Sequence, residues 1–257
     1  MQFYLSLLAT SLKSMISLRA TFFLEVILLF LNNCVFLVLW WLFFLEFRTV
    51  GSWQIQEVVL TLAFMSASYG LMTIFFGGVR MLSRTILSGG LDPFLTQPKN
   101  ILLHLLMSTS LPRGFGHLFT AAFFLICYGL TDFQTIILFC LGAISGCIVL
   151  TSVRTIANSL SFWGGSIEPL AERYVDSLFL LGSYPTNIYS GWLQFLMFTL
   201  VPAGIMTYLP VELIREFYWS KLLLLLFAAA FFAFLAFFVF YRGLRRYESG
   251  NQIALRV

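Results

Sequence analysis

Three carboxylates follow one another at intervals of four residues in the second half of the chain. They are Glu168, Glu172 and Asp176. A helix places residues four apart on one face, so the three would form an acidic stripe. Charges at the depth of a bilayer are costly, and such a stripe must therefore face water or protein. Two interpretations are open: a cytoplasmic connecting helix, or a polar face that lines a path through a dimer.

Few other residues could support catalysis. The chain has two histidines, His104 and His117, and neither belongs to an H-E-x-x-H motif or to a cluster with metal-ligand spacing. No G-x-x-x-x-G-K-[ST] loop is present, so the chain lacks this means of holding ATP phosphates. We expect no catalytic, metal or cofactor site here. An intramembrane enzyme and an ATP-independent channel are the alternative classes, although no predicted span carries the repeated polar stripe of a pore.

The composition is that of a membrane protein. Hydrophobic residues make up 60% of the 257 residues and charged residues only 10%, whereas a soluble domain carries about 25% charged residues. We therefore expect one domain over residues 1–257, built of spanning helices in contact with lipid, and no nucleic-acid partner. Four cysteines lie inside apolar runs and are predicted to be small core side chains. They are Cys34, Cys127, Cys140 and Cys147.

Apolar stretches predict six spanning helices, since about 20 apolar residues cross a bilayer. Their approximate ranges are 22–44, 58–79, 118–130, 133–153, 174–189 and 221–241. Trp40 and Trp41 end the first stretch and are suited to a membrane interface. Only Thr131 and Asp132 separate the third stretch from the fourth, which predicts an antiparallel hairpin. The fifth stretch has the least distinct pattern.

The distribution of positive charge predicts the orientation. With the amino terminus in the cytoplasm and six crossings, twelve of the fifteen Lys and Arg residues fall on the cytoplasmic side. Only Arg48, Arg215 and Lys221 fall outside. This bias follows the positive-inside rule and predicts that both termini are cytoplasmic.

The first 19 residues have the pattern of an amphipathic helix. Leu5, Leu8, Leu12 and Met15 recur at helical spacing, which predicts an interfacial helix on the inner membrane surface. A loosely ordered tail is the alternative. The basic residues come late and no small-residue cleavage site follows, so we do not expect a signal peptide.

The cytoplasmic loop over residues 80–113 contains an abrupt break, "SGGLDPFLTQP". Gly89 and Gly90 can adopt backbone angles that are closed to other residues, and should end the extension of the second span. Asp92 is expected to be the N-cap of a new helix, with Pro93 at its first position. Pro98 disfavours helical angles in the preceding residue, so this helix should be short.

The short helix is expected to end near Thr96 and to present Leu91, Phe94 and Leu95 as apolar knobs. Asn100 is expected to cap a second helix that runs through "ILLHLLMSTS". Water offers the apolar knobs no partner. They therefore lie either on the bilayer surface, as an interfacial turn, or in a groove of another subunit.

Prolines interrupt the apolar region before the last span. They are Pro185, Pro202 and Pro210. Prolines break helices, and broken helices survive at membrane depth only when protein or a cavity surrounds them. We expect outer re-entrant helices over residues 186–219, with ordinary kinked helix packing as the alternative.

The loop resembles that of a known family of membrane proteins. The residues Gly90-Leu91-Asp92, Leu95 and Pro98 match the pattern Gly-x-Asp-x-x-Leu-x-x-Pro of six-span permeases of type-two ATP-binding-cassette exporters. The sequence departs from the family at Lys99, where the family usually continues with an apolar residue. A second similarity is a later series of short motifs. They are Tyr184-Pro185, Ile188-Tyr189, Val201-Pro202-Ala203 and Tyr208-Leu209-Pro210.

The resemblance covers nearly the whole chain and implies a function. It implies a permease subunit of an ATP-driven exporter in a bacterial inner membrane, with a separate ATPase subunit that binds the ATP. The residues implied to couple the two subunits are Gly90, Leu91, Asp92, Phe94, Leu95 and Pro98. The family also implies a second permease copy, or a similar permease, as partner.

Overall fold

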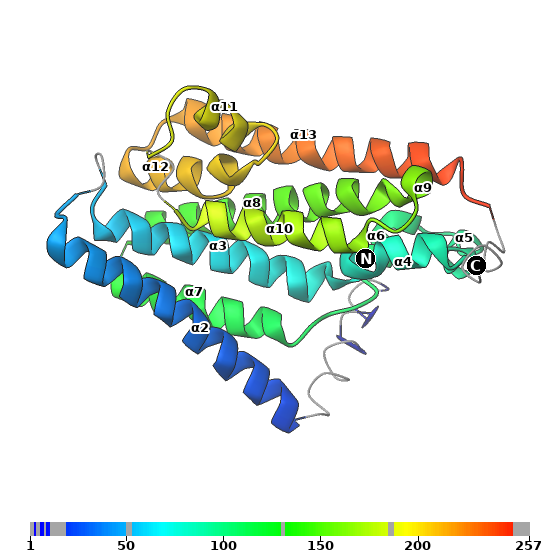
Figure 1. The fold of residues 1–257 in the computed structure, drawn as a ribbon, viewed down its shortest axis with the longest axis horizontal. Coiled ribbons are helices and arrows are strands. Elements are labelled where there is room, and N and C mark those ends of the chain that lie inside the picture. The colour runs from blue at the N-terminus through cyan, green and yellow to red at the C-terminus, as the bar shows by residue number, and fades with distance from the viewer. Residues whose placement is uncertain are drawn as a thin grey trace.

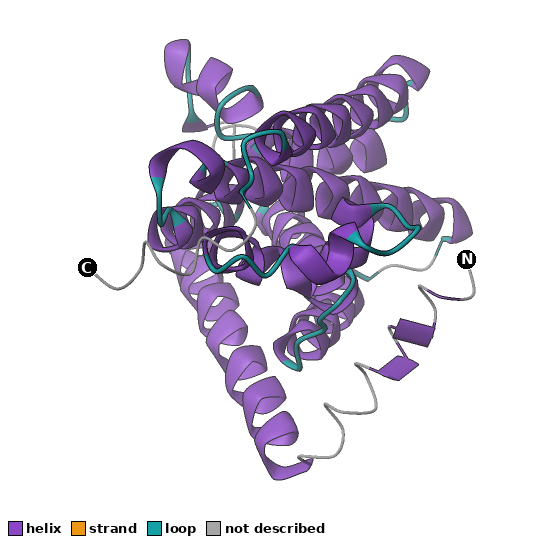
Figure 2. Ribbon diagram, turned by 90° about the vertical axis from the view of Figure 1, so that its right-hand side faces the viewer, coloured by secondary structure: helices purple, strands orange, loops and turns teal. Residues whose placement is uncertain are grey.

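The computed structural model describes residues 3, 6–7, 9–10, 19–49, 53–129, 132–184 and 188–248. Within these ranges, every element of secondary structure is a helix, and loops join the helices (Figure 2). The chain is therefore all-α, as predicted. Most of the interfacial helix predicted over residues 1–19, and Pro185 of the outer region, lie outside the described residues.

Six long helices lie along the molecule, and successive ones run in opposite directions (Figure 1). They are α2 (Arg19–Glu46), α3 (Ile55–Phe75), α7 (Arg113–Tyr128), α8 (Phe133–Ser159), α10 (Glu168–Gly182) and α13 (Trp219–Leu244). Each overlaps one of the six predicted apolar stretches. Several predicted bounds were wrong by four to seven residues. Helix α3 stops at Phe75, before the Gly77-Gly78 pair, and α10 begins at Glu168 and stops at Gly182.

Four of these helices are long and apolar enough to cross a membrane by length and composition. They are α2, α3, α13, and α8 with the short helix that follows it, over Phe133–Gly164. The other two, α7 and α10, have 16 and 15 residues, which corresponds to about 24 and 22 Å of helix. They are shorter than the roughly 30 Å of a bilayer core.

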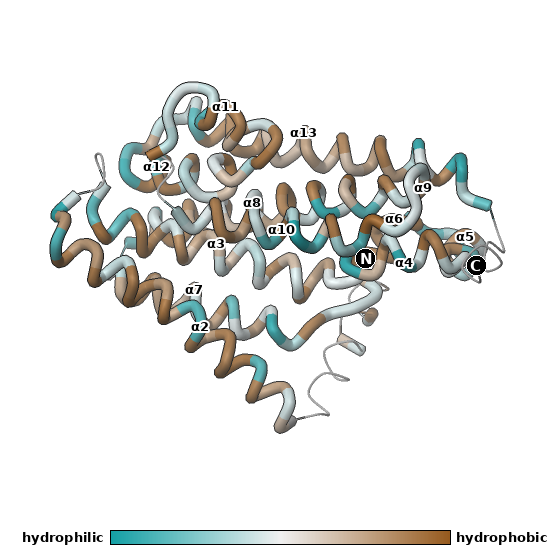
Figure 3. The backbone as a smooth tube through the Cα atoms, in the orientation of Figure 1, coloured by the Kyte–Doolittle hydropathy of each residue, from teal (hydrophilic) through white to brown (hydrophobic). Residues whose placement is uncertain are grey.

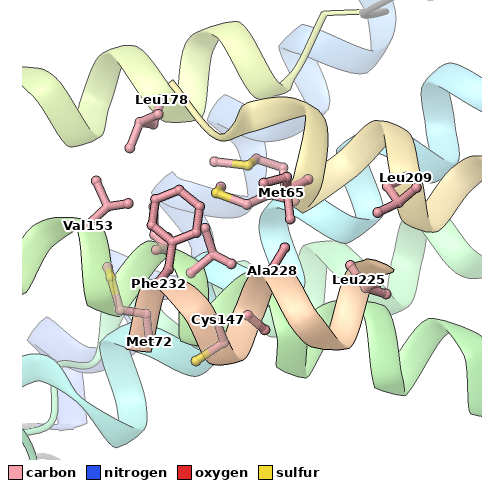
Figure 4. Close-up of a cluster of buried hydrophobic side chains, with 14 of the residues drawn as sticks. Met65, Met72, Cys147, Val153, Leu178, Leu209, Leu225, Ala228 and Phe232 are labelled. Atoms are coloured by element: carbon pink, nitrogen blue, oxygen red, sulfur yellow. The ribbon is translucent and has the colours of Figure 1, made fainter. Parts of the chain in front are cut away.

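Helix α3 forms the centre of the bundle, and most of its residues are buried. It contacts α2, α7, α8 and α10. One apolar cluster joins α3 to α8, α10, α12 (Leu209–Arg215) and α13 (Figure 4). Its labelled members are Met65, Met72, Cys147, Val153, Leu178, Leu209, Leu225, Ala228 and Phe232.

Glycines allow the neighbours of α3 to approach closely. A Cβ on Gly70 would lie 3.0 Å from the carbonyl oxygen of Gly114 in α7. On the other side, a Cβ on Gly142 of α8 would lie 2.5 Å from the Phe64 ring. Small residues at helix contacts are typical of membrane bundles, where dispersion forces between close backbones replace the hydrophobic effect.

Two long helices leave most of their apolar surface outside the bundle. They are α2, which contacts α7 and α3 along part of its length, and α13, which lies along α8. Both are strongly hydrophobic over long stretches (Figure 3). Apolar surface of this extent on long helices is what lipid accommodates.

Short helices occupy the two ends of the bundle (Figure 1). One end carries η1 (Gly77–Met81), α4 (Leu82–Leu87), α5 (Asp92–Leu95), α6 (Ile101–Leu106) and α9 (Ser161–Gly164). The opposite end carries α11 (Trp192–Phe198), the π-helical segment η3 (Gly204–Tyr208) and α12. The predicted cytoplasmic loop and the predicted outer region are thus at opposite ends.

In the predicted outer region, a turn over residues 199–202 joins α11 to η3 and α12. The turn reaches back to α10, because the Tyr174 hydroxyl donates a hydrogen bond to the carbonyl oxygen of Leu200. Pro202 is buried just before η3, and Pro210 is buried in the first turn of α12. At the end of α10, the Tyr184 ring makes an edge contact with Trp40 of α2, with centroids 5.7 Å apart. Pro202 therefore lies just before a helix start, where its missing N–H has no helical partner to lose. Pro210 instead lies within a continuous helical run over residues 203–215, where its missing N–H interrupts the helical hydrogen bonds.

A charged cluster connects α10 to two other elements. Arg154 of α8 is only 1% exposed and pairs with the carboxylate of Glu172. Arg80 of η1 pairs with the same carboxylate, with Nε 3.1 Å from Oε1. The structure thus shows Arg80 and Arg154, which the sequence had suggested only as markers of orientation, as partners of one acid.

The opposite end also pairs its charges. Arg215 lies 3.5 Å from Glu57 and 2.7 Å from Glu212, and Lys221 lies 3.4 Å from Glu212. Two of the three basic residues that the orientation rule places outside are therefore compensated by acids within reach.

We predict that Glu172→Gln destabilises the protein by about 1–3 kcal/mol, because the substitution leaves the buried Arg154 charge without a counter-ion. The loss is limited because part of the site still reaches solvent. The measurement is the free energy of unfolding in detergent, from SDS titration. Glu168→Gln, one turn earlier on the same helix and outside any ion pair of the described residues, is the matched control. Equal losses in the two variants would contradict the structural role of the cluster.

Candidate functional site

The break in the loop begins where α4 ends. Gly89 has a φ of +72°, in the left-handed region that other residues avoid. The amide of Gly90 donates to the carbonyl oxygen of Thr85 at 2.9 Å, which is the six-to-one bond of a Schellman motif. The predicted role of Gly89 is confirmed. Gly90 does not have a positive φ, and its role is to supply the closing hydrogen bond.

The short helix that follows is α5, and its N-cap is not the predicted one. Leu91 is the N-cap and Asp92 is the first helical residue. The prediction placed the N-cap one residue too late, because Leu91 already has helical backbone angles, φ −79° and ψ −20°. Pro93, predicted at the first helical position, is at the second. The helix ends at Thr96, its C-cap, as predicted. Pro98 follows in an exposed, non-helical segment.

The three predicted apolar knobs differ in exposure. Leu91 is fully buried, in a cluster with Ile86, Leu102 and Phe240, so its prediction as an exposed knob was wrong. Phe94 is partly buried and makes an edge contact with the ring of His104, with centroids 4.9 Å apart. Only Leu95, at 41% exposed, stands clear of the loop. One apolar side chain therefore fixes the turn, and another is presented outward.

The turn is also tied to the last long helix. The hydroxyl of Tyr247, just after α13, donates to Oδ1 of Asp92 at 2.9 Å. Partial burial and this hydrogen bond raise the pKa of Tyr247, so the phenol remains a donor at neutral pH. Sequence reasoning missed this partner, because 155 residues separate the two side chains and no local pattern announces the contact.

The backbone behind the turn is packed unusually closely. A Cβ on Gly78 would clash with the carbonyl oxygen of Leu105 in α6, and a Cβ on Gly77 would come 2.6 Å from that of Thr109. The Gly-Gly pair thus lets η1 lie directly against α6 and the segment after it. The pair itself was the only sequence signal of this contact.

Helix α6 completes the loop. The side chain of Asn100 accepts a hydrogen bond from the amide of Leu103 at 2.9 Å, which confirms the predicted cap. The helix ends at Leu106, although the sequence predicted that it would continue through Ser110. Lys99, where the sequence departs from the family pattern, lies over the ring of Phe3.

The carboxylate stripe is not a single site. Glu172 is held by Arg80 and Arg154, as described above. Glu168 lines a polar pocket of about 240 Å³ together with Arg80 and Arg113. Asp176 lines a second pocket of about 180 Å³, also bordered by Arg113. Glu172 also borders the pocket with Glu168. The middle of the stripe is thus neutralised by two arginines, and both ends line open pockets.

Among the described residues, no three His, Cys, Asp or Glu side chains are grouped closely enough to hold a metal ion. The polar residues found above can position loops and line pockets. The fold and these contacts together describe a helical membrane protein with a fixed turn, α5, at one end.

Comparison with protein families agrees with this architecture. Residues 11–251 match the model of a family described as ABC-2 family transporter protein. The match covers nearly the whole chain. The chain belongs to the ABC-2 transporter family. No curated protein and no solved structure matches it at a significant level.

Membership identifies the chain as a permease, the membrane subunit of a transport system rather than an enzyme. It also agrees with the long apolar helices, which indicate an integral membrane protein. In this permease, the turn between the second and third long helices combines an exposed apolar side chain, Leu95, with contacts that fix the turn in place.

We predict that Tyr247→Phe loosens α5 without unfolding the permease, because it removes one hydrogen bond worth about 0.5–1.5 kcal/mol and keeps the ring. The measurement is hydrogen–deuterium exchange, in which peptides covering α5 should exchange several-fold faster while those of α3 do not change.

Tyr218→Phe is the matched control, since Tyr218 precedes α13 at the opposite end of the same helix. If α5 exchanges at the wild-type rate in Tyr247→Phe, the tie between the turn and α13 is not a stabilising one.

Proposed function

We propose that this permease is the membrane-spanning subunit of an ATP-driven exporter, and that a separate ATPase subunit docks on α5. The observation that carries the proposal is the turn itself. It presents Leu95 and the adjoining Pro93 and Pro98 outward, while Leu91 and the Asp92–Tyr247 bond fix its position. A small apolar surface on a rigid support is suited to a groove on a partner protein.

The permease binds no nucleotide itself in this proposal. The chain has no phosphate-binding loop of the G-x-x-x-x-G-K-[ST] type, so ATP is bound and hydrolysed on the partner. Closure of the ATPase then moves α5, and the turn transmits the motion to the helices that hold it. Transport follows as an alternation between two packings of the spans, biased by the affinity of the ATPase for each.

In this proposal all six long helices cross the cytoplasmic membrane of a bacterium, with both termini inside. The shorter helices α7 and α10 are extended across the bilayer by the segments that flank them. Support comes from the charge bias of the sequence and from the alternating directions of the helices. The proposed orientation puts α5 in the cytoplasm, and puts α11 and α12 at the outer side as re-entrant helices that close the transport path.

The permease works as a dimer with a second copy or a similar permease. Helix α10 exposes Arg173 and Asp176, and charged side chains are rarely left facing lipid. A second subunit across this face would enclose a polar path along α10. The path would include Asp176 and the neighbouring pocket with Glu168.

The docking proposal is tested by co-purification of the tagged permease with an ATPase encoded beside its gene. Leu95→Asp should reduce the bound ATPase at least about tenfold, since a charge placed in an apolar contact costs more than 1.4 kcal/mol. Phe94 is a poorer probe, because its partial burial against α6 makes it part of the loop's own packing.

Leu103→Asp serves as the control, because Leu103 has the same side chain and similar exposure, 43%, on neighbouring α6. Retention of the ATPase by Leu95→Asp, or equal loss in both variants, would contradict docking through α5.

The orientation is tested with single added cysteines and a membrane-impermeant thiol reagent on intact cells. Thr96→Cys should be labelled only after the membrane is opened, because α5 is cytoplasmic in this proposal. Glu216→Cys, in the exposed segment between α12 and α13, should be labelled in intact cells. The wild-type chain measures the background from its four native cysteines, and the reverse labelling pattern would overturn the topology.

A further inference from the structure

A polar pocket lies where α2, α3, α7 and α10 meet, away from the turn. Its volume is about 180 Å³. The side chains that line it include Asn32 and Asn33 of α2, Arg113 and His117 of α7, and Asp176 of α10. The pocket opens at the side of the bundle, because Asn32 and Asp176 are exposed whereas Asn33 and His117 are buried. Polar and charged side chains between membrane helices are expensive and tend to mark functional sites.

The two charged residues of the pocket have opposite signs but do not neutralise each other. Arg113 and Asp176 make no ion pair with any described residue. Elsewhere the same bundle pairs its charges closely, as in the cluster of Glu172 with Arg80 and Arg154. The pocket therefore offers a separate cationic and anionic group to whatever occupies it.

The pocket also contains a buried polar atom without a partner. His117 is only 6% exposed, and its Nδ1 has no hydrogen-bond partner among the described residues. Asn33 is equally buried, and its side-chain amide donates to Oγ1 of Thr120 at 3.4 Å. Polar side chains in the lining of the pocket favour a ligand with polar groups of its own.

Aromatic rings form one wall. The ring of Tyr69 lies 4.8 Å from that of His117 and 5.4 Å from that of Phe179, between ring centroids. Aromatic faces near a carboxylate are suited to an organic cation, because the ring quadrupole and the negative charge both attract it. The side with Asp176 thus favours an ammonium group, whereas Arg113 and the amides favour an anionic group.

A second pocket adjoins this site, because the two share a lining residue. It is about 240 Å³ in volume, and Arg113 borders both pockets. Its other charged lining residues are Arg80, Glu168 and Glu172, of which Arg80 and Glu172 pair with each other. Glu168 and Arg113 thus give this pocket, too, one acidic and one basic side chain outside any ion pair of the described residues.

We propose that the pocket between Arg113 and Asp176 binds an ammonium–phosphate zwitterion, the head group of a zwitterionic amphiphile. The phosphate lies against Arg113 and the asparagine amides, and the ammonium lies against Asp176 and the aromatic wall. The pocket then selects the cargo of the permease, a role that rests on the proposed transport function. The binding itself does not depend on an ATPase.

Binding is measured on the purified full-length chain, without an ATPase, by native mass spectrometry with added phosphatidylethanolamine or phosphatidylglycerol. Both lipids carry a phosphate, but only the first carries an ammonium. The wild-type chain should bind phosphatidylethanolamine at least about tenfold more tightly. Asp176→Asn should remove this preference, while Arg113→Gln should weaken the binding of both lipids.

Arg173→Gln is the matched control, because Arg173 is an exposed arginine on α10 that does not line the pocket. Equal binding of the two lipids by the wild type, or an Asp176→Asn variant that behaves like this control, would overturn the proposal. The proposal would also be overturned if Asp176→Asn and Arg113→Gln both bind the two lipids as the wild type does, because the pocket would then take no part in binding.

Soluble phosphoethanolamine distinguishes the two sources of this chemistry. If it displaces phosphatidylethanolamine, the free zwitterion suffices; if the lipid preference persists without displacement, the acyl chains contribute to binding. Variants are compared only when they elute and melt like the wild type. If the wild-type chain keeps its lipid preference but no ATPase co-purifies with it, the docking proposal alone is refuted. If the ATPase co-purifies but the wild-type chain shows no lipid preference, the pocket proposal alone is refuted.

Discussion

The buried charge of Arg154 is the constraint on which much of this structure depends. A guanidinium inside a helical bundle is strongly destabilising unless an acid lies beside it. Glu172 is that acid, and it accepts hydrogen bonds from Arg154 and Arg80. This requirement fixes the start of α10 against α8. It also fixes η1, and hence the segment from which the loop with α5 begins.

Further polar contacts extend this connection. The side-chain amide of Asn158, one turn after Arg154, donates to the carbonyl oxygen of Val79 at 3.1 Å. The hydroxyls of Ser83 and Ser161 lie 2.6 Å apart in a buried hydrogen bond. Because α5 is also tied to α13 through Leu91 and Tyr247, a force applied to the turn would reach α8, α10 and α13. The turn is thus connected to three of the six long helices by contacts that the chain order does not suggest.

The sequence predicted features that depend on local or repeated patterns. Apolar stretches predicted six long helices, and the Gly89 turn and the Asn100 cap were predicted because their chemistry lies within a few residues. It failed where distant partners decide. Leu91 is buried in a cluster that includes Phe240 of α13, Asp92 is bonded to Tyr247 across 155 residues, and the partners of Glu172 come from two other elements. No pattern within a few residues carries that information.

The different roles of the acids on α10 follow from helix geometry. Glu172 and Asp176 share a face, yet they are separated by about 6 Å along the axis. That distance moves Asp176 beyond the reach of Arg154 in α8 and places it beside a pocket bordered by α7. One acidic stripe can therefore be structural at its centre and open to ligands at its ends. The four-residue spacing predicted the shared face, but only the packing of α7 and α8 against different turns of α10 decides which acid is neutralised.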